Sequence, residues 1–461
     1  MSTREHDIVS VSSPRGLSAF SATTESRKSI QYRITIEVDM LAQMRFEKTP
    51  VRVSQQSYDE RVCSRCMGHR ALCGVRPCPL VMRARALSDI EGAVTGLDLS
   101  GSSPPSVFVG DHGYPKVLAG PLVPPVSGDA SAIMERPDLW LDRTIDEILS
   151  FRFSLVRTKK SIPVEAAADP PRLLTETQTL ALSESPTSSE ATLLKRPRFT
   201  KIFSDVTLPI GPSAPLELFV LEDNPRVPRT VDKVTSDTDL KAVGGIIEMF
   251  KDGIHQQHVT RLLSVGLLGE QKKRRLVPTK WSITAVDDII SKDLHKKVLH
   301  YPWLNEFVVH SDHALGNTVT LLFLPSGWQF EALECWLGGF NPPIISDHEW
   351  FKGRKDYASS VVGAYYATRL PALEYLVDIR KQAGVIVFME IDPQRWVPLG
   401  VWRFREIARR ALANNGKRFS TLKEAIAEIG SLLRNPIGRW LKASKLYEEY
   451  TTQTKVTDFF D

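Results

Sequence analysis

Apolar and polar positions alternate with recognisable periods along most of the chain beyond residue 100. Residues 104–110 form a short apolar run, residues 111–113 are typical of a turn, and residues 114–118 return as a second run. This order predicts a β-hairpin. Between residues 142 and 157 the apolar positions recur with helical spacing, which predicts a helix with one buried face.

Two stretches lack such a pattern. Residues 158–198 are rich in Pro, Ser, Thr and Glu and hold one helical island at 173–182, so they predict a connector of modest structure. Residues 209–215 contain three prolines, which lack a backbone donor, and irregular structure is expected there.

The C-terminal half mixes helical and strand patterns. Helices are predicted at 237–249, 253–265, 359–370 and 372–383, and strands at 306–310, 318–324 and 385–390. Pro371 separates the last two helices. Thr421 and Glu424 form a capping box that opens a further helix. Strands and helices do not alternate regularly, which indicates an α+β fold or an irregular α/β fold.

The composition is that of a globular protein with room for several domains. The chain has 461 residues, of which 42% are apolar and 25% charged, and its net charge of +5 permits an anionic partner without requiring one. We expect two mixed domains, a small N-terminal four-cysteine zinc module and a flexible C-terminal tail. The expected segments are a disordered arm (1–32), the zinc module (33–90), an N-terminal mixed domain (91–260), a C-terminal mixed domain (261–450) and the tail (451–461).

Four of the five cysteines lie within sixteen positions: Cys63, Cys66, Cys73 and Cys78. Paired spacing of this kind in a cytosolic protein indicates a metal site. Four thiolates suit tetrahedral zinc and leave no ligand position open, so a structural zinc ion is expected. Iron–sulfur ligation and metal-free thiols are the alternatives. The fifth cysteine, Cys335, is predicted to be a core residue.

The segment 453–460 reads Gln-x-x-Val-x-x-Phe-Phe. Its spacing resembles the peptide by which replication and repair proteins bind the sliding clamp PCNA. On a single helical turn Val456, Phe459 and Phe460 form one apolar plug. Gln453 then hydrogen-bonds in a separate pocket. The alternative is that the two phenylalanines fold back onto the protein's own core.

A basic run contains five cations and one tryptophan: Lys272, Lys273, Arg274, Arg275, Lys280 and Trp281. The cations are predicted to meet a phosphate backbone and Trp281 to stack on a base. A solvated loop is the alternative. In the preceding helix, His255 and His258 have no nearby acid to complete a metal site, so a polar helix face is expected there.

Carboxylates occur in small groups at Asp237–Asp239, Asp287–Asp288 and Asp347–Glu349. Such groups hold Mg²⁺ in metal-dependent nucleases. Helix capping is the safer interpretation of the first two groups. The sequence contains no phosphate-binding loop, dinucleotide fingerprint, zinc-protease motif or nucleophile elbow, so it does not establish an enzyme.

Longer motifs resemble the archaeal Nre DNA-repair family. The segments that carry the likeness are the cysteine cluster 63–79, 108–110, 113–115, 211–215, 224–228, 236–241, 274–287, 363–367 and 398–402. The resemblance covers most of the chain from the cysteine cluster onward. It implies a DNA-damage-response protein with a four-cysteine zinc finger and a clamp-binding peptide, and it implies no catalytic mechanism.

The combined prediction is a DNA-repair factor that its tail recruits to PCNA and that contacts DNA through basic patches. A metal-dependent repair enzyme, nuclease-like or nucleotide-acting, is one alternative, and a clamp adaptor without DNA contact is another. No apolar run reaches the length of a membrane span and no signal sequence precedes the first domain. A cytoplasmic, nucleoid-associated location without a membrane partner is therefore expected.

Overall fold

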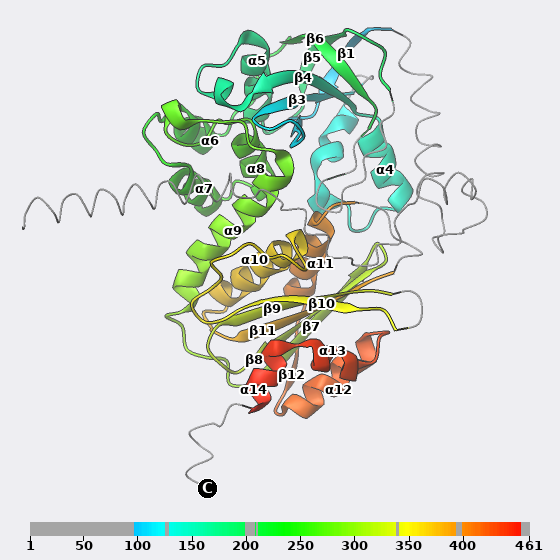
Figure 1. Cartoon of the computed structure of the whole chain (residues 1–461), viewed down its shortest axis with the longest axis vertical. Helices are drawn as coiled ribbons and strands as arrows, with labels where there is room; N and C mark the ends of the chain where they lie inside the picture. Colours follow the sequence, from blue (N-terminus) through cyan, green and yellow to red (C-terminus); the bar gives the residue numbers. More distant parts are fainter. Residues whose placement is uncertain are drawn as a thin grey trace, which may run out of the picture. The chain divides into compact units, whose positions relative to one another are not determined.

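The structure, a computed structural model, describes residues 96–124, 129–198, 208, 211–337, 341–392 and 399–452. These residues fall within one compact unit, Val51–Asp461, and form two six-stranded sheets with helices packed around them (Figure 1). The mixed α/β class predicted from the sequence is thereby confirmed. The predicted zinc module and tail peptide lie outside the described residues, and the predicted domain boundaries stay predictions.

The first sheet contains β1 (Asp98–Ser103), β2 (Val107–Val109), β3 (Lys116–Val123), β4 (Val156–Pro163), β5 (Thr187–Leu193) and β6 (Ser213–Leu221). Its strand order is β1-β5-β6-β4-β3-β2, and neighbours are antiparallel except for β4 and β6. The antiparallel pairing of β2 with β3 confirms the predicted hairpin.

Residues 158–198 form regular structure where the composition predicts a connector. They contain most of β4, the helix α5 (Arg172–Leu182), which matches the predicted helical island, and all of β5. The sequence pattern does not predict β4 and β5, because residues with hydroxyl groups occupy buried positions where large apolar residues are usual. Ser103 and Ser189 are fully buried, and their hydroxyl groups form a hydrogen bond with each other at 2.7 Å.

Proline is tolerated at the start of β6. This strand includes Pro215, which lies in the segment 209–215 where irregular structure is expected. Pro215 has no N–H to donate, but its carbonyl accepts a hydrogen bond from the Leu194 N–H at 3.0 Å. The position therefore needs only an acceptor, which explains why proline does not end the strand.

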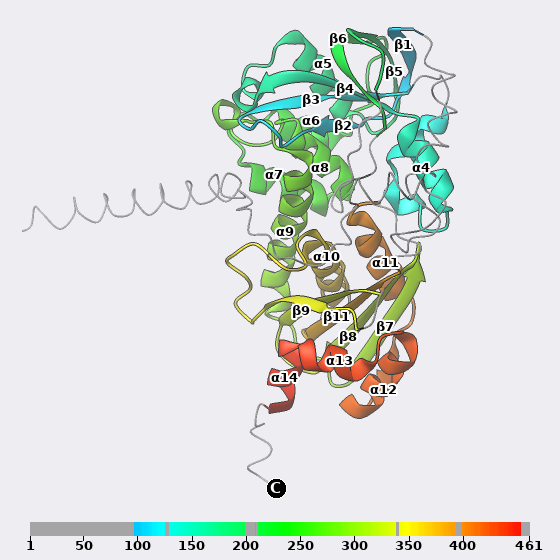
Figure 2. The same ribbon diagram turned by 45° about the vertical axis from the view of Figure 1, so that its right-hand side comes forward.

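Helix α9 (Thr279–Val298) runs from the first sheet toward the second, and further helices come before it in the chain (Figure 2). Besides α5, these are η1 (Asp129–Glu135), η2 (Pro137–Leu139), α4 (Ile145–Phe153), η3 (Val164–Ala167), α6 (Arg229–Ser236), α7 (Ala242–Lys251), α8 (Gln256–Ser264) and η4 (Gln271–Lys273). The helices predicted at 142–157, 237–249 and 253–265 are confirmed as α4, α7 and α8 with shifted ends. Within the described residues, no helix is long and apolar enough to cross a membrane.

The second sheet contains β7 (Phe307–Ala314), β8 (Asn317–Leu324), β9 (Gln329–Trp336), β10 (Ile344–Glu349), β11 (Gly384–Ile391) and β12 (Lys417–Phe419). Its order is β10-β9-β11-β8-β7-β12, with β9 and β11 parallel. Strands β7, β8 and β11 confirm the predicted strands.

Helices cover both faces of the second sheet. Figure 1 shows α10 (Gly363–Asp378) and α11 (Trp402–Ala413) on one side and α12 (Leu422–Leu432), α13 (Ile437–Ala443) and α14 (Lys445–Thr452) on the other. As a result β11 is buried along its whole length. The predicted capping box is confirmed, since the Thr421 hydroxyl accepts from the Glu424 N–H at 3.3 Å and opens α12.

The break predicted near Pro371 is wrong, because α10 continues through this residue. An internal proline removes one backbone hydrogen bond and normally bends or ends a helix. The residues around Pro371 are buried, and α10 packs against both α9 and α11. Tertiary packing therefore overrides the local preference.

Candidate functional site

Several of the residues predicted to carry function lie outside the described part of the chain. These are the four zinc ligands Cys63, Cys66, Cys73 and Cys78, and the four clamp anchors Gln453, Val456, Phe459 and Phe460. Cys335 is described and is fully buried on β9, where Asn435 Nδ2 contacts its sulfur at 3.3 Å. Burial raises the pKa of the Cys335 thiol to about 11, in keeping with the predicted core role.

The cations of the predicted basic run make contacts within the protein. Lys273 pairs with Glu270 at 2.6 Å, Arg275 pairs with Glu165 at 3.3 Å, and Lys280 pairs with Asp111. Lys272 is exposed. Surface pairs of this kind are weak, so most of these side chains remain available to a stronger anion.

Arg274 differs from its neighbours because it holds two elements together. Its guanidinium donates to the carbonyls of Thr235 and Asp237 at 2.9 Å each, at the C-terminal end of α6, and to the Gly269 carbonyl at 2.9 Å. A cation at this end satisfies carbonyls that the helix leaves without partners. Arg274 therefore has a structural role that the sequence does not reveal.

Trp281 lies in the first turn of α9 and is 9% exposed. Its ring packs against Tyr114 with 5.3 Å between the ring centroids. This burial leaves little of the indole face for the predicted stacking on a base.

The two histidines of the 253–265 segment do not share a polar face. His255 precedes α8, and its Nδ1 accepts a hydrogen bond from the Gln257 N–H at 3.3 Å. His258 is a residue of α8, and its side chain is buried against the rest of the protein. Burial lowers the pKa of His255 to about 4 and the pKa of His258 to about 2. Both imidazoles are therefore neutral at pH 7.

The carboxylates predicted to cap helices have other roles. Asp237 accepts from the N–H groups of Asp239 and Leu240 at 2.9 Å each, which stabilises the turn between α6 and α7 rather than a helix start. These backbone hydrogen bonds hold the pKa of Asp237 below its usual range. Asp287 and Asp288 lie in the middle of α9, because this helix begins at Thr279.

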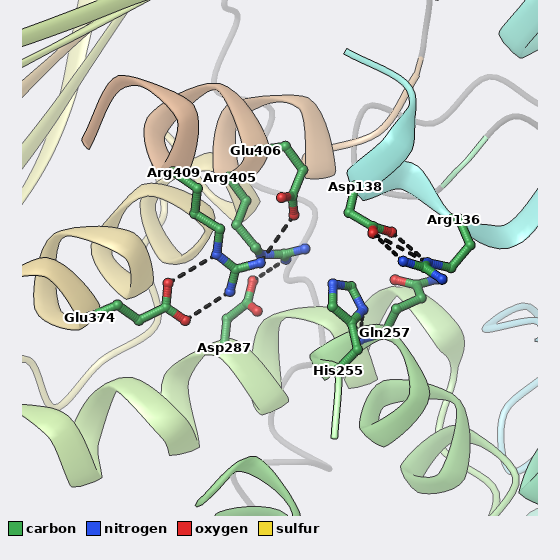
Figure 3. A network of polar contacts seen from close by, with 9 residues as sticks. All are labelled: Arg136, Asp138, His255, Gln257, Asp287, Glu374, Arg405, Glu406 and Arg409. Atoms are coloured by element: carbon green, nitrogen blue, oxygen red, sulfur yellow. Dashed lines mark hydrogen bonds and ion pairs between the residues drawn. The ribbon is translucent and has the colours of Figure 1, made fainter. Parts of the chain in front are cut away.

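Asp287 belongs to a network of ion pairs between three helices (Figure 3). It pairs with Arg405 of α11, and both side chains are almost completely buried. One turn further along α11, Arg409 contacts both carboxylate oxygens of Glu374 on α10, at 2.8 and 2.9 Å. Arg409 also pairs with Glu406 at 3.2 Å. The network connects α9, α10 and α11, and no pattern in the sequence predicts it.

The protonation of this network follows from burial and pairing. Burial raises the pKa of Asp287, and the charge of Arg405 opposes that shift. Burial alone would lower the pKa of Arg409, but Glu374 and Glu406 raise it. Figure 3 also shows Arg136, Asp138 and His255 facing the end of this network. Asp138 is held by Arg136 at 2.7 Å.

A small cavity lies beside Arg405. Ser106, Phe108, Glu135, Arg152, Gln257, Thr279 and Trp402 are among its other lining residues, and its volume is about 40 Å³. Arg405 Nε and Asp287 Oδ1 are buried without a hydrogen-bond partner among the described residues. The cavity has room for water but is far smaller than a pocket that encloses a nucleotide. We therefore assign this network a structural role.

The third acidic group is also engaged with protein partners. On β10, Asp347 pairs with Arg354 at 2.9 Å and Glu349 pairs with Arg369 at 2.7 Å. In the described parts of the chain, no three His, Cys, Asp or Glu side chains gather as potential metal ligands. The described carboxylates thus give no support to the nuclease-like alternative.

Comparison with known proteins identifies relatives along most of the chain. The family model described as "Archaeal Nre, N-terminal" matches residues 72–340, and the model described as "Archaeal Nre, C-terminal" matches residues 349–459. The first match includes Cys73 and Cys78 but begins after Cys63 and Cys66. The second includes Gln453, Val456 and Phe459.

The alignments with three curated relatives cover most of each relative's length. "DNA repair protein NreB" of Archaeoglobus fulgidus is 36% identical over 398 residues, which cover 85% of this chain and 98% of that protein. "DNA repair protein NreA" of the same organism is 35% identical over 407 residues, covering 86% and 98%. "DNA repair protein NreA" of Haloferax volcanii is 32% identical over 356 residues, covering 74% and 85%. No solved structure matches the chain.

Proposed function

The chain belongs to the archaeal Nre family, and from this membership we propose that it is a DNA-repair protein that docks on the sliding clamp PCNA. The proposed anchors are Gln453, Val456, Phe459 and Phe460. The names of the relatives support the repair role. The observation that carries the docking role is the spacing of these four residues, three of which lie inside the C-terminal Nre match.

The element that precedes the tail also supports docking. Helix α14 ends at Thr452, directly before Gln453. Its first turn is fixed to β9 by the buried carboxylate of Glu331, which accepts from the N–H groups of Lys445 at 3.1 Å and Leu446 at 3.0 Å. A peptide that starts at a fixed helix end keeps its protein close to the clamp without further contacts.

Replacing both Phe459 and Phe460 with Ala tests this proposal. We expect clamp binding in calorimetric titration to fall below detection, because burial of each ring contributes roughly 1.5–3 kcal/mol. The clamp of the same organism is the titrant. A matched control, Thr454→Ala with Thr457→Ala, changes two positions that the motif leaves free and should bind like the wild type. Equal affinity of the phenylalanine variant and the wild type would refute docking through this segment.

The proposal includes a structural zinc ion held by Cys63, Cys66, Cys73 and Cys78. It also includes DNA contact through the exposed cations of the 272–280 loop, with Arg274 and Trp281 removed from the contact set because of their structural roles. The clamp adaptor without DNA contact remains the alternative, since Lys273, Arg275 and Lys280 each have an internal acidic partner. A cytoplasmic, nucleoid-associated location follows from this role.

A further inference from the structure

Three aromatic side chains of the second half of the chain are exposed to solvent. Trp303 is 60% exposed, Phe351 50% and Trp350 39%, and Trp303 is the most exposed large apolar side chain among the described residues. Single exposed apolar residues are common on protein surfaces, whereas clusters of them mark binding surfaces. The question is therefore whether these rings lie together.

Gly327 places two of the rings side by side. A Cβ atom added to this glycine would lie 3.8 Å from Trp303 Cζ2 and 3.9 Å from Phe351 Cδ2. Both rings therefore border the same stretch of backbone. Trp350 is the neighbour of Phe351 in the chain, and its ring packs on His348 with 4.7 Å between centroids. We call the surface formed by Trp303, Gly327 and Phe351 the aromatic platform.

The backbone that carries the platform is held in place. The Gln382 N–H donates to the Pro302 carbonyl at 2.9 Å, and the Leu304 N–H donates to the Gln382 carbonyl at 2.9 Å, so the chain is fixed on both sides of Trp303. On the other side, the imidazole Nε2 of His295 contacts the Phe351 carbonyl at 3.2 Å. The rings are thus presented on fixed backbone, which lowers the ordering cost of binding.

Four cations lie close to the platform segments along the chain. Lys352 and Lys355 follow Phe351 in the loop between β10 and α10, which Figure 2 shows in yellow. Arg380 and Lys381 precede Gln382, the residue that is bonded to the Trp303 segment. Within the described ranges, none of these four cations has an ion pair. Two exposed carboxylates, Asp356 and Asp378, lie in the same two segments, and these segments together still carry a net positive charge.

We infer that the aromatic platform binds single-stranded DNA by stacking unpaired bases on Trp303 and Phe351, with the flanking cations contacting the phosphates. Aromatic rings combined with cations are the usual means of holding single strands without sequence preference. A duplex keeps its base faces stacked inside, so it offers nothing to these rings. The choice of DNA over RNA rests on the proposed function; the choice of a single-stranded polyanion rests on the surface itself.

Titration of a labelled oligothymidine, followed by fluorescence anisotropy, tests the inference. Trp303→Ala and Phe351→Ala should each weaken binding about tenfold or more, because stacking on one ring commonly contributes that much. Trp303→Phe should retain most of the affinity, since a ring remains. The matched control Leu194→Ala removes a side chain that is 51% exposed on another part of the surface and should bind like the wild type.

The possible failures are distinguishable. If the wild type binds oligothymidine and both alanine variants bind it equally well, the platform is not the DNA site, while the proposed repair function stands. If oligouridine binds tighter than oligothymidine, the assignment to DNA is overturned. If the wild type binds no single-stranded DNA but still binds the clamp, both the platform and the DNA contact of the proposed function are overturned. Unchanged thermal unfolding of the variants shows that they are folded.

Discussion

At the scale of single residues, the partners of buried charges are the features that are hardest to predict from the sequence. The sequence predicts Asp287 as a helix cap, but this residue is buried in mid-helix against Arg405, which lies 118 positions away. No local pattern reveals such a partner. The same holds for Arg274, whose basic neighbours suggest a phosphate contact although its own donors are taken up by backbone carbonyls.

The ion pair of Asp287 and Arg405 leads to a stability prediction. We expect Asp287→Leu to lower the free energy of unfolding by about 3–5 kcal/mol, because it leaves the Arg405 charge buried without a counter-charge. The double variant Asp287→Leu with Arg405→Met should be more stable than Asp287→Leu alone. Denaturant unfolding measures both. As a control, Lys233→Met breaks an exposed pair with Glu248, which water and salt screen, and should leave stability close to that of the wild type. Additive losses in the double variant would contradict this interpretation.

The lowered pKa of His258 makes the free energy of unfolding depend on pH. Its pKa is about 2 in the folded protein and 6.5 in the unfolded chain, since burial penalises the charged form. Above pH 6.5 neither state binds the proton, and its contribution to stability is fully present. As the pH falls below 6.5 only the unfolded chain takes it up, so stability decreases by up to about 1.4 kcal/mol per pH unit toward pH 4.

We therefore expect His258→Gln to flatten the stability profile between pH 6.5 and pH 4 relative to the wild type. Urea unfolding at a series of pH values is the measurement. The control is Asn415→Gln, which changes an exposed side chain that carries no titratable group and should leave the slope as it is. A slope that His258→Gln does not alter would mean that the imidazole is charged in the folded state.

At the scale of secondary-structure elements, apolar periodicity is informative where large residues form the core. The β2–β3 hairpin, β11 and the capping box of α12 are predicted from the sequence for this reason. Strand β5 is missed because hydroxyl groups replace apolar side chains in its buried positions. The continuity of α10 is missed because it depends on packing against α9 and α11 rather than on its own sequence.

Buried carboxylates on the second sheet hold helix ends, and Glu331 provides a test. Glu331→Gln removes one of two acceptor oxygens, so we expect faster amide hydrogen exchange at Lys445 and Leu446 and a loss of about 1–3 kcal/mol in stability. The matched variant Glu390→Gln should affect the amides of Arg434 and Asn435 instead, because Glu390 accepts from these groups at 2.9 and 2.8 Å. Equal exchange at α14 in the wild type and in Glu331→Gln would show that the carboxylate does not fix this helix.

At the scale of the whole molecule, the family could be recognised from motifs, whereas the arrangement of the sheets could not. Strands β1 and β5 pair although about 90 residues separate them, a pairing that no local pattern encodes. The candidate nucleic-acid residues illustrate the same limit. The run 272–281 is conspicuous in the sequence, while the aromatic platform joins residues from separate loops that only the fold brings together.

The proposed zinc ligands Cys63, Cys66, Cys73 and Cys78 lie outside the described residues. We expect the purified protein to contain about one zinc ion per chain and Cys78→Ser to lose it, because metal binding and local folding are coupled. Cys335→Ser should keep the ion, since Cys335 is buried far from the cluster in sequence. Elemental analysis measures the metal content. Iron together with visible absorbance in the wild type would contradict the zinc proposal and indicate an iron–sulfur cluster instead.

The internal pairing of the 272–280 loop has a consequence for the ions around the protein. A free lysine or arginine that meets a phosphate releases the counterion that was condensed on the nucleic acid. When Lys273, Arg275 or Lys280 turns from its own carboxylate to a phosphate, that carboxylate becomes bare and attracts a cation from the solution. Ion uptake then offsets part of the ion release. If the proposed DNA contact runs through this loop, we therefore expect binding to be less sensitive to salt than the number of positive charges in the loop suggests.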